Sequence, residues 1–249
     1  MHEMKQLAGK VALVTGGSRG IGAAIARRLA HDGAAVAFTY VNAVEHARAV
    51  AKEIDAAGGL ALVIQADSAD PGAVAAAVEE TVAKLSRIDI LVNNAGIFVG
   101  GPLEELTAQD ADHIWAVDVR AVFVASQAAA RHMSAGGRII TIGTNFIDRV
   151  PRPGFTLYAM CKAALAGLTK ALARDLGPRG ICAVLVNPGP TDTDMNPADG
   201  PGAPRLTPLT ALGRYGSPDD VAAAVSYLAG EGGKHVTGTA ITVDGGMTA

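Results

Sequence analysis

The sequence has few aromatic residues and almost no cysteine, and each shortage excludes a class of structure. Aromatic residues account for 4% of the 249 residues while apolar residues reach 49%, so Ala, Val, Ile and Leu must build the core. The two cysteines, Cys161 and Cys182, form neither a disulfide framework nor a C-x-x-C pair. The six histidines are scattered without metal-ligand spacing, so we expect no metal site.

Long hydrophobic runs and blocks of like charge are also missing. No run approaches the roughly 18 uncharged apolar residues of a membrane span, and residues 1–10 lack the apolar centre of a signal peptide. A net charge of -3 argues against a nucleic-acid binder that neutralises phosphates. We therefore expect a soluble, cytoplasmic protein that binds a small molecule and neither nucleic acid nor membranes.

The chain instead alternates short apolar runs with helical patterns. Apolar runs without polar alternation are typical of strands buried on both faces, and they lie at residues 11–14, 35–38, 60–64, 88–92, 138–142, 181–186 and 240–243. Helical patterns lie between them at 23–30, 44–57, 71–85, 107–134, 157–176 and from 217 onward. This alternation predicts an α/β protein with one domain over residues 1–249, a doubly wound parallel sheet covered by helices on both faces.

In such a sheet, ligands bind at the carboxyl ends of the strands. One long irregular segment, residues 187–215, is rich in proline and glycine. Irregular segments of this length in compact domains are usually functional, so we expect a lid or substrate loop there.

Three glycines mark the first turn from strand to helix. Gly16, Gly20 and Gly22 follow the apolar run at 11–14 in the spacing G-x-x-x-G-x-G. Without Cβ atoms, the backbone can make a tight turn and approach a pyrophosphate at the N-terminus of the following helix. The pattern predicts a dinucleotide site, and its alternative is a glycine-rich turn without a ligand.

The residue about 20 positions later indicates which dinucleotide is preferred, because an acid there would bind the ribose 2′-hydroxyl of NAD. Residues 39–42 are Thr-Tyr-Val-Asn, and the first acid, Glu45, already lies inside the next helix. Arg19 lies within the glycine turn, where its guanidinium could pair with a 2′-phosphate. We therefore favour NADP(H) over NAD(H). If Arg19 is only solvated, both cofactors would bind.

A tyrosine and a lysine four residues apart form the candidate chemical centre. Tyr158 and Lys162 project from one face of the helix expected over 157–176. A phenol ordinarily titrates near pH ~10, and a neighbouring cation lowers its pKa because it stabilises the phenolate. The spacing predicts an acid/base pair. The alternative is a lysine that extends over an aromatic ring toward solvent.

Together these residues resemble the short-chain dehydrogenase/reductase family over essentially the whole chain. The resemblance rests on residues 15–22, Asp67, residues 93–96, residues 158–162, and Pro188-Gly189 with Thr193. It implies a Rossmann-type sheet of seven strands and an NADP(H)-dependent oxidoreductase that transfers hydride between nicotinamide and a carbonyl or secondary alcohol. Tyr158 would be the proton donor and acceptor, and Lys162 would hold the nicotinamide ribose.

The resemblance also implies where the cofactor lies and how the chain assembles. Asp67 would accept a hydrogen bond from the adenine amine, and residues 188–193 would meet the nicotinamide. A homo-oligomer, either a dimer or a tetramer, would pair the helices expected at 107–134 and 157–176. The cofactor-binding residues would be Gly16, Ser18, Arg19, Gly20, Ile21, Gly22, Tyr40, Asp67, Ser68, Asn94, Ala95, Gly96, Tyr158, Lys162, Pro188, Gly189, Thr191 and Thr193.

Two positions depart from the family pattern. The family has a serine thirteen residues before the tyrosine that hydrogen-bonds the substrate oxygen, but Asn145 stands there and Thr144 precedes it. We predict that Thr144 takes this role, because it keeps the hydroxyl, with Asn145 and its amide donor as the alternative. Asp118 stands where the family has an asparagine in a proton relay. It either keeps a catalytic role through its backbone carbonyl or pairs with Arg120 or Lys162.

Several other residues invite a functional interpretation with a simpler alternative. Cys161 is expected to be a small buried residue rather than a nucleophile, because no histidine is placed to activate it. Arg149, Arg152 and Arg205 would border the substrate entrance, where they either hold an anionic substrate or are solvated loop charges. The departures at the site also leave open a nucleotide-binding regulatory protein with little turnover.

Overall fold

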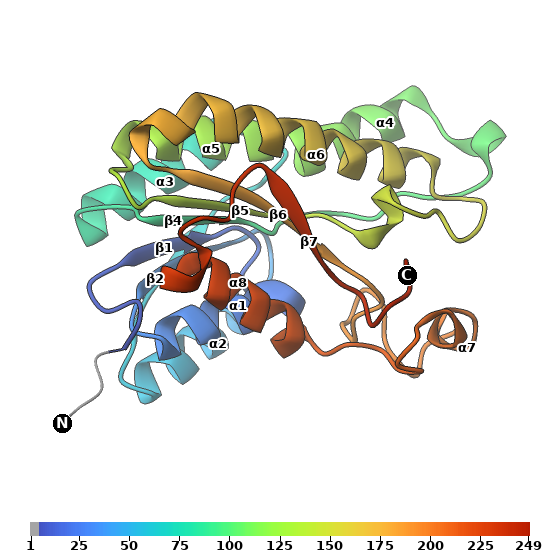
Figure 1. Ribbon diagram of the computed structural model, residues 1–249, viewed down its shortest axis with the longest axis horizontal. Coiled ribbons are helices and arrows are strands. Elements are labelled where there is room, and N and C mark those ends of the chain that lie inside the picture. The colour runs from blue at the N-terminus through green and yellow to red at the C-terminus, as the bar shows by residue number, and fades with distance from the viewer. Residues whose placement is uncertain (1–4) are drawn as a thin grey trace.

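Seven short runs rich in Val, Ile, Leu and Ala form the strands of one parallel sheet in the computed structural model, which describes residues 5–249 (Figure 1). The strands are β1 (Val11–Val14), β2 (Ala35–Tyr40), β3 (Leu60–Gln65), β4 (Ile90–Asn93), β5 (Arg138–Ile142), β6 (Cys182–Pro188) and β7 (Thr239–Val243). Their spatial order is β3-β2-β1-β4-β5-β6-β7, and every neighbouring pair is parallel. The predicted seven-stranded Rossmann-type sheet is confirmed.

Helices cover both faces of this sheet (Figure 1). One face carries α1 (Gly20–His31), α2 (Val44–Ala56) and α8 (Pro218–Ala229), and the other carries α3 (Pro71–Leu85), α5 (Ala121–His132) and α6 (Thr156–Leu176). α4 (Ala108–Trp115) precedes α5, and the four-residue α7 (Ala203–Leu206) lies beyond β6. Among the described residues, no helix is long and apolar enough to cross a membrane.

The sheet is buried where two helical layers meet it. All four residues of β1 and of β4 are buried, which is why their sequences show no polar alternation. Strand order reverses between β1 and β4, since β2 and β3 lie on one side and β5, β6 and β7 on the other. A crevice therefore opens at the carboxyl ends of β1 and β4, where doubly wound sheets bind ligands.

The long helix expected over 107–134 is interrupted. Thr107 caps α4 as expected, in a reciprocal capping box with Asp110. Residues Ala116–Arg120 then form one π-helical turn before α5 continues to His132. A π turn inserts an extra residue into a helix and is often found at functional sites, and this one contains Asp118.

The segment expected to be irregular over 187–215 is partly regular. β6 extends through Pro188, because Asn187 and Pro188 pair in register with Thr242 and Val243 of β7. The remainder holds α7 and a 3₁₀ turn at Thr207–Leu209. Proline and glycine content obscured these short elements in the sequence.

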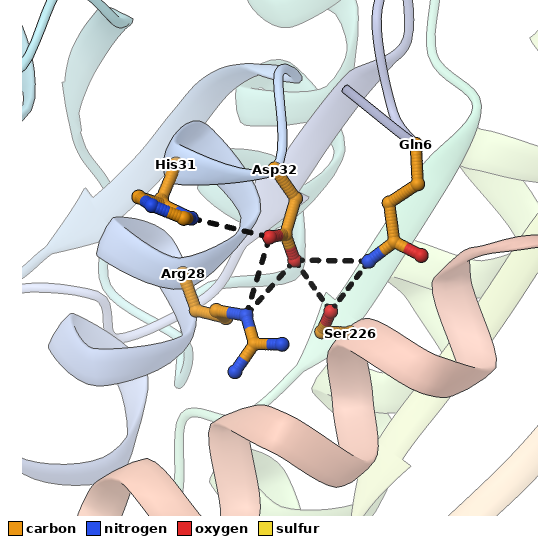
Figure 2. A network of polar contacts seen from close by, with 5 residues as sticks. All are labelled: Gln6, Arg28, His31, Asp32 and Ser226. Atoms are coloured by element: carbon orange, nitrogen blue, oxygen red, sulfur yellow. Dashed lines mark hydrogen bonds and ion pairs between the residues drawn. The ribbon is translucent and has the colours of Figure 1, made fainter. Parts of the chain in front are cut away.

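A polar network ties the N-terminal segment to two helices (Figure 2). The nearly buried carboxylate of Asp32, just after α1, accepts hydrogen bonds from Gln6 at 3.2 Å and Arg28 at 3.0 Å, and also from Ser226 on α8. His31 lies 3.3 Å away. Burial alone would raise the pKa of the Asp32 carboxyl, but these side-chain hydrogen bonds outweigh it and hold the pKa below its usual value.

The lowered pKa of Asp32 predicts a pH-dependent contribution to stability. Because the folded-state pKa is depressed, the contribution is present above the unfolded-state value of about 4 and is lost as pH falls through the folded-state value. We expect Asp32→Asn to lower the free energy of unfolding by about 1–3 kcal/mol at pH 7, measured by urea denaturation, and by progressively less as pH falls below the unfolded-state value. Asp55→Asn, at an exposed position on α2, is the control. The prediction is contradicted if Asp32→Asn lowers the free energy of unfolding equally at neutral and acidic pH.

Candidate functional site

A cavity of about 830 Å³ lies at the carboxyl ends of the central strands. Its walls come from the turns after β1, β2, β3, β4, β5 and β6 and from the start of α6. Each residue that the sequence suggested for the cofactor lines this cavity: Gly16, Ser18, Arg19, Gly20, Ile21, Gly22, Tyr40, Asp67, Ser68, Asn94, Ala95, Gly96, Tyr158, Lys162, Pro188, Gly189, Thr191 and Thr193. Thr144 and Asn145 also line it, whereas Asp118 does not.

The glycine turn is shaped so that an anion can approach its backbone. Gly16 and Gly20 have φ values of +66° and +53°, which side chains rarely adopt. A Cβ atom on Gly22 would lie 2.3 Å from the carbonyl oxygen of Gly16, so only glycine fits. The N-cap of α1, Arg19, makes no side-chain hydrogen bond to the helix end, and the first N–H groups of α1 stay available to a phosphate.

The turn after β4 locks the glycine turn in place. The side-chain amide of Asn94 donates to the carbonyl oxygens of Thr15 at 2.9 Å and Gly16 at 3.1 Å. In return, the hydroxyl of Thr15 accepts from the backbone N–H groups of Asn94 and Ala95, both at 3.0 Å. The two central strands thus hold one rigid wall of the cavity between them.

The end of the cavity near β2 contains two residues that sequence reasoning missed. Asn42 and His46 line it beside Tyr40, and His46 lies in the first turn of α2. Their position in the sequence could have identified them, because they follow β2 closely, where the 2′-hydroxyl site was expected. Arg19 is exposed, and its guanidinium lies 3.9 Å from the exposed carboxylate of Asp194. Such an exposed ion pair contributes at most about 1 kcal/mol, so a stronger anion can replace Asp194.

Tyr158 and Lys162 lie one helical turn apart near the start of α6, and both line the cavity. The Lys162 ammonium lies 5.9 Å from the centroid of the Tyr158 ring and donates to the carbonyl oxygen of Ile142 at 3.3 Å. Its burial would lower its pKa, but the neighbouring Asp118 carboxylate raises the pKa above the ordinary value. Lys162 therefore carries its charge across the physiological pH range.

Asp118 pairs with Lys162, one of the two partners that the sequence suggested. Its carboxylate is fully buried, with one oxygen 3.1 Å from the Lys162 ammonium. The other oxygen accepts a hydrogen bond from the backbone N–H of Ile97 at 2.9 Å. Arg120 instead donates to the carbonyl oxygen of Ala69 at 2.8 Å. The π turn thus places a negative charge directly behind the lysine of the candidate acid/base pair.

Thr144 and Asn145 both border the cavity, but they are bound differently. The Thr144 hydroxyl oxygen accepts from the backbone N–H of Phe146 at 3.3 Å, and no described hydrogen bond uses its O–H as a donor. The Asn145 amide donates to Asp244 at 3.3 Å. Asp244 is in turn held by the backbone N–H of Thr248 at 3.0 Å. Thr144 therefore keeps a donor for a ligand, while the amide of Asn145 anchors the C-terminal segment.

Three phenylalanine rings gather around the tyrosine, another feature that sequence reasoning missed. Phe98, Phe146 and Phe155 surround Tyr158 and line the same cavity. Their sequence positions are far apart, so only the fold reveals the cluster. Cys161, by contrast, is fully buried, and burial raises the pKa of its thiol, as expected of a packing residue.

Known proteins match this chain over nearly its whole length. A family model described as enoyl-(acyl carrier protein) reductase matches residues 16–248. A short-chain dehydrogenase from Burkholderia cenocepacia J2315, crystallised with NADP, is 56% identical with a TM-score of 0.97 and covers 98% of this chain and 100% of its own. A short-chain dehydrogenase/reductase from Serratia marcescens BCRC 10948 is 55% identical with a TM-score of 0.96 and the same coverage. The chain belongs to the short-chain dehydrogenase/reductase family.

A further relative of this short-chain dehydrogenase/reductase carries a different kind of name. The cyclic-di-GMP-binding biofilm dispersal mediator protein of Escherichia coli K12 is 46% identical over 99% of this chain and 100% of its own. The relatives of this chain therefore include a protein named for binding cyclic-di-GMP and mediating biofilm dispersal as well as proteins named for oxidoreductase activity.

Proposed function

We propose that this short-chain dehydrogenase/reductase is an NADP(H)-dependent oxidoreductase that transfers hydride between nicotinamide and a carbonyl or secondary alcohol. The observation that carries the proposal is the placement of the Tyr158 phenol and the charged Lys162 in the same cavity as the open glycine turn. The NADP bound to the Burkholderia relative supports the choice of cofactor.

The cavity fits a dinucleotide. The pyrophosphate would lie on the glycine turn at the N-terminus of α1, and the adenosine would lie between Tyr40 and Asp67. The nicotinamide would lie between Tyr158 and the segment from Pro188 to Thr193. When bound, this cofactor supplies or accepts the hydride.

The residues of this chain would bind the carbonyl oxygen of the substrate and transfer its proton. In the reducing direction, the Tyr158 phenol donates a proton to the carbonyl oxygen as negative charge develops there, and in the oxidising direction it accepts one. The Thr144 hydroxyl donates a second hydrogen bond to that oxygen, and the charged Lys162 stabilises the phenolate. These groups are held by helix and strand ends, so they need little reorganisation during the reaction.

The phosphate preference would come from Arg19 and His46. Neither an aspartate nor a glutamate lines the cavity at the end of β2, where an acid would favour the 2′-hydroxyl of NAD. Arg19 and His46 both line the cavity, where they would bind a 2′-phosphate, and the N-terminus of α2 would add its partial positive charge.

The segment after β6 would close over the substrate. The residues of this segment that line the cavity are Thr191, Thr193, Asp194, Met195, Asn196, Gly202 and Leu206.

The single domain would assemble with further copies of the chain. Trp115, Phe123 and Met160 are exposed on the π-interrupted helix and on α6, which is the surface that we propose pairs in a homo-oligomer. The mass of the protein in solution, measured by light scattering, tests this proposal, and a monomer at micromolar concentration would rule it out.

The two buried free cysteines suit a cytoplasmic location.

A binding protein with little turnover is the rival function, motivated by the Asp118 substitution and by the name of the Escherichia coli relative. The deciding experiment measures NADPH oxidation with ketones, aldehydes, quinones and β-keto thioesters. We expect turnover with at least one class and a loss of at least about 10³-fold in Tyr158→Phe, because the proton donor is removed. Tight NADPH binding without turnover on any class would favour the rival.

The donor to the substrate oxygen is tested by two single substitutions. Thr144→Ala removes the free hydroxyl, and we expect kcat to fall by about 10²-fold, as for loss of one donor to a developing oxyanion. Asn145→Ala should change kcat by less than about tenfold and lower the melting temperature instead, since its amide holds Asp244. The reverse pattern would assign the oxygen to Asn145.

The buried pair of Asp118 and Lys162 predicts a shift in pH dependence. While Lys162 stays charged, removing the carboxylate leaves that charge less neutralised, so it stabilises the Tyr158 phenolate more strongly. The same change removes the group that raises the pKa of the buried Lys162, so this pKa falls. We expect Asp118→Asn to keep or raise kcat near neutral pH and to lose activity at a lower pH than the parent on the alkaline side, where Lys162 loses its charge. Asp112→Asn, on the exposed side of α4, is the control. A large loss of kcat at all pH values would mean that the carboxylate has its own catalytic task.

Arg19 is tested through cofactor binding alone. NADPH should raise the melting temperature more than NADH at equal concentration, because only NADPH carries the 2′-phosphate. Arg19→Ala should shrink this difference, whereas Arg48→Ala, at an exposed position on α2 outside the cavity, should not. An unchanged difference in Arg19→Ala would transfer the role to His46.

A further inference from the structure

Four of the ten aromatic residues of this chain lie together beside the cavity. The sequence has only five Phe, four Tyr and one Trp, yet three phenylalanines and Tyr158 form a closed ring of contacts. Phe98 lies 5.4 Å between ring centroids from Phe155 and 5.4 Å from Tyr158. Phe146 completes the ring at 4.8 Å from Phe155 and 6.2 Å from Tyr158. A core built almost entirely from aliphatic residues thus has an aromatic wall beside its candidate proton donor.

This wall faces the cavity rather than closing a core. All four rings line the cavity, and the pairs meet in tilted or edge-to-face geometry. Phe155 is buried and fixes the arrangement, whereas Phe98 is 46% exposed, so part of its apolar surface has no protein neighbour. Aromatic groups prefer offset-stacked or edge-to-face partners, and such pairs are more favourable than the burial of their area alone. An aromatic ligand would use this surface better than an aliphatic one.

A cation stands next to the aromatic wall. The Arg152 guanidinium lies 4.6 Å from the centroid of Phe155, and Arg152 lines the cavity. Among the described residues, no carboxylate lies within ion-pair distance of it. Of the three arginines expected to border the substrate entrance, only Arg152 lines the cavity; Arg149 and Arg205 do not.

The lysine, the other arginine and Asp67 of the cavity either pair with another charge or lie away from the substrate end. Lys162 is paired with Asp118, and Arg19 lies beside Asp194. Asp67 follows β3, at the opposite side of the sheet from β5 and α6. The substrate end therefore carries a positive charge that is not neutralised by a neighbouring acid of the described chain. A planar guanidinium binds a carboxylate with two parallel hydrogen bonds, which an ammonium cannot do.

We propose that the substrate is an aromatic ketone that carries a carboxylate, a specificity that rests on the proposed oxidoreductase function. The aryl ring would lie against the exposed surface of Phe98, and the carboxylate would pair with Arg152. In the reducing direction, NADPH gives its hydride to the carbonyl carbon and becomes NADP⁺, and Tyr158 gives its proton to the oxygen. A secondary aryl alcohol results. Arg152 and Phe98 set specificity and take no part in the chemical step.

The test uses the full chain with NADPH and matched ketones. The first set is 2-, 3- and 4-acetylbenzoate, and the controls are their uncharged methyl esters and 4-acetylcyclohexanecarboxylate, which keeps the charge without the ring. We expect kcat/KM for at least one acetylbenzoate to exceed that of both controls by about tenfold or more, in line with roughly 1.4 kcal/mol for each tenfold step.

Two variants separate the roles of charge and ring. Arg152→Gln should lower kcat/KM for the preferred acetylbenzoate by about tenfold or more, mainly through KM, and change that of its methyl ester by less than about twofold. Phe98→Leu should reduce the preference for the aryl over the cyclohexyl compound. Arg149→Gln, at an exposed position near Arg152 but outside the cavity, is the matched control and should change neither.

The outcomes distinguish the inference from the function beneath it. Turnover of ketones without preference for the acetylbenzoates, or equal effects of Arg152→Gln and Arg149→Gln, would overturn the substrate class and leave the oxidoreductase function intact. Absence of turnover with every ketone, aldehyde, quinone and β-keto thioester, despite NADPH binding, would overturn both.

Discussion

The parallel pairing of β1 with β4 is the constraint on which the site depends. These adjacent strands belong to oppositely wound halves of the sheet, so the turns that follow them diverge and leave a crevice. The crevice is rigid because Asn94, after β4, bonds the backbone of the glycine turn after β1, and Thr15 bonds back. A dinucleotide pocket at this place follows from topology, and the side chains determine only which dinucleotide and which substrate it holds.

The buried ion pair of Lys162 with Asp118 determines the electrostatics of the chemical centre. Removing one partner from a buried pair typically costs about 3–5 kcal/mol because the other charge stays desolvated. Here the backbone N–H of Ile97 donates a hydrogen bond to one carboxylate oxygen, and Lys162 donates to the carbonyl oxygen of Ile142. The other carboxylate oxygen has only the Lys162 ammonium beside it, so the carboxylate depends on the ion pair. The π turn matters because it contains Asp118, whose buried carboxylate faces Lys162 of α6. The Asp118 carboxylate thus keeps Lys162 charged, but it also partly neutralises that charge, so Lys162 stabilises the Tyr158 phenolate less strongly.

The fold was predictable from sequence because its signals are local and repeated. Strands buried on both faces read as unbroken apolar runs, and glycine spacing with strand and helix on either side identified the turn at Gly16. The π turn at 116–120 was not predictable, since no residue type in Ala-Val-Asp-Val-Arg distinguishes it from an α-helical turn. Helical spacing predicted that Tyr158 and Lys162 act together, and the family resemblance added Thr144; all three line one cavity. The sequence left the partner of Asp118 open, because that choice depends on side-chain directions that only the three-dimensional structure provides.

The aromatic wall shows why substrate specificity escapes sequence reasoning in this fold. Phe98 follows β4, Phe146 follows β5 and Phe155 precedes α6, so no spacing rule connects them. Each ring alone resembles an ordinary loop residue, and Arg152 alone resembles a solvated charge. Their meaning arises from proximity, because a cation over an aromatic ring beside a proton donor recognises both the ring and the charge of one ligand. Loops at the carboxyl ends of β4 and β5 can change without disturbing the sheet, so substrate choice can vary while Tyr158 and Lys162 stay fixed by α6.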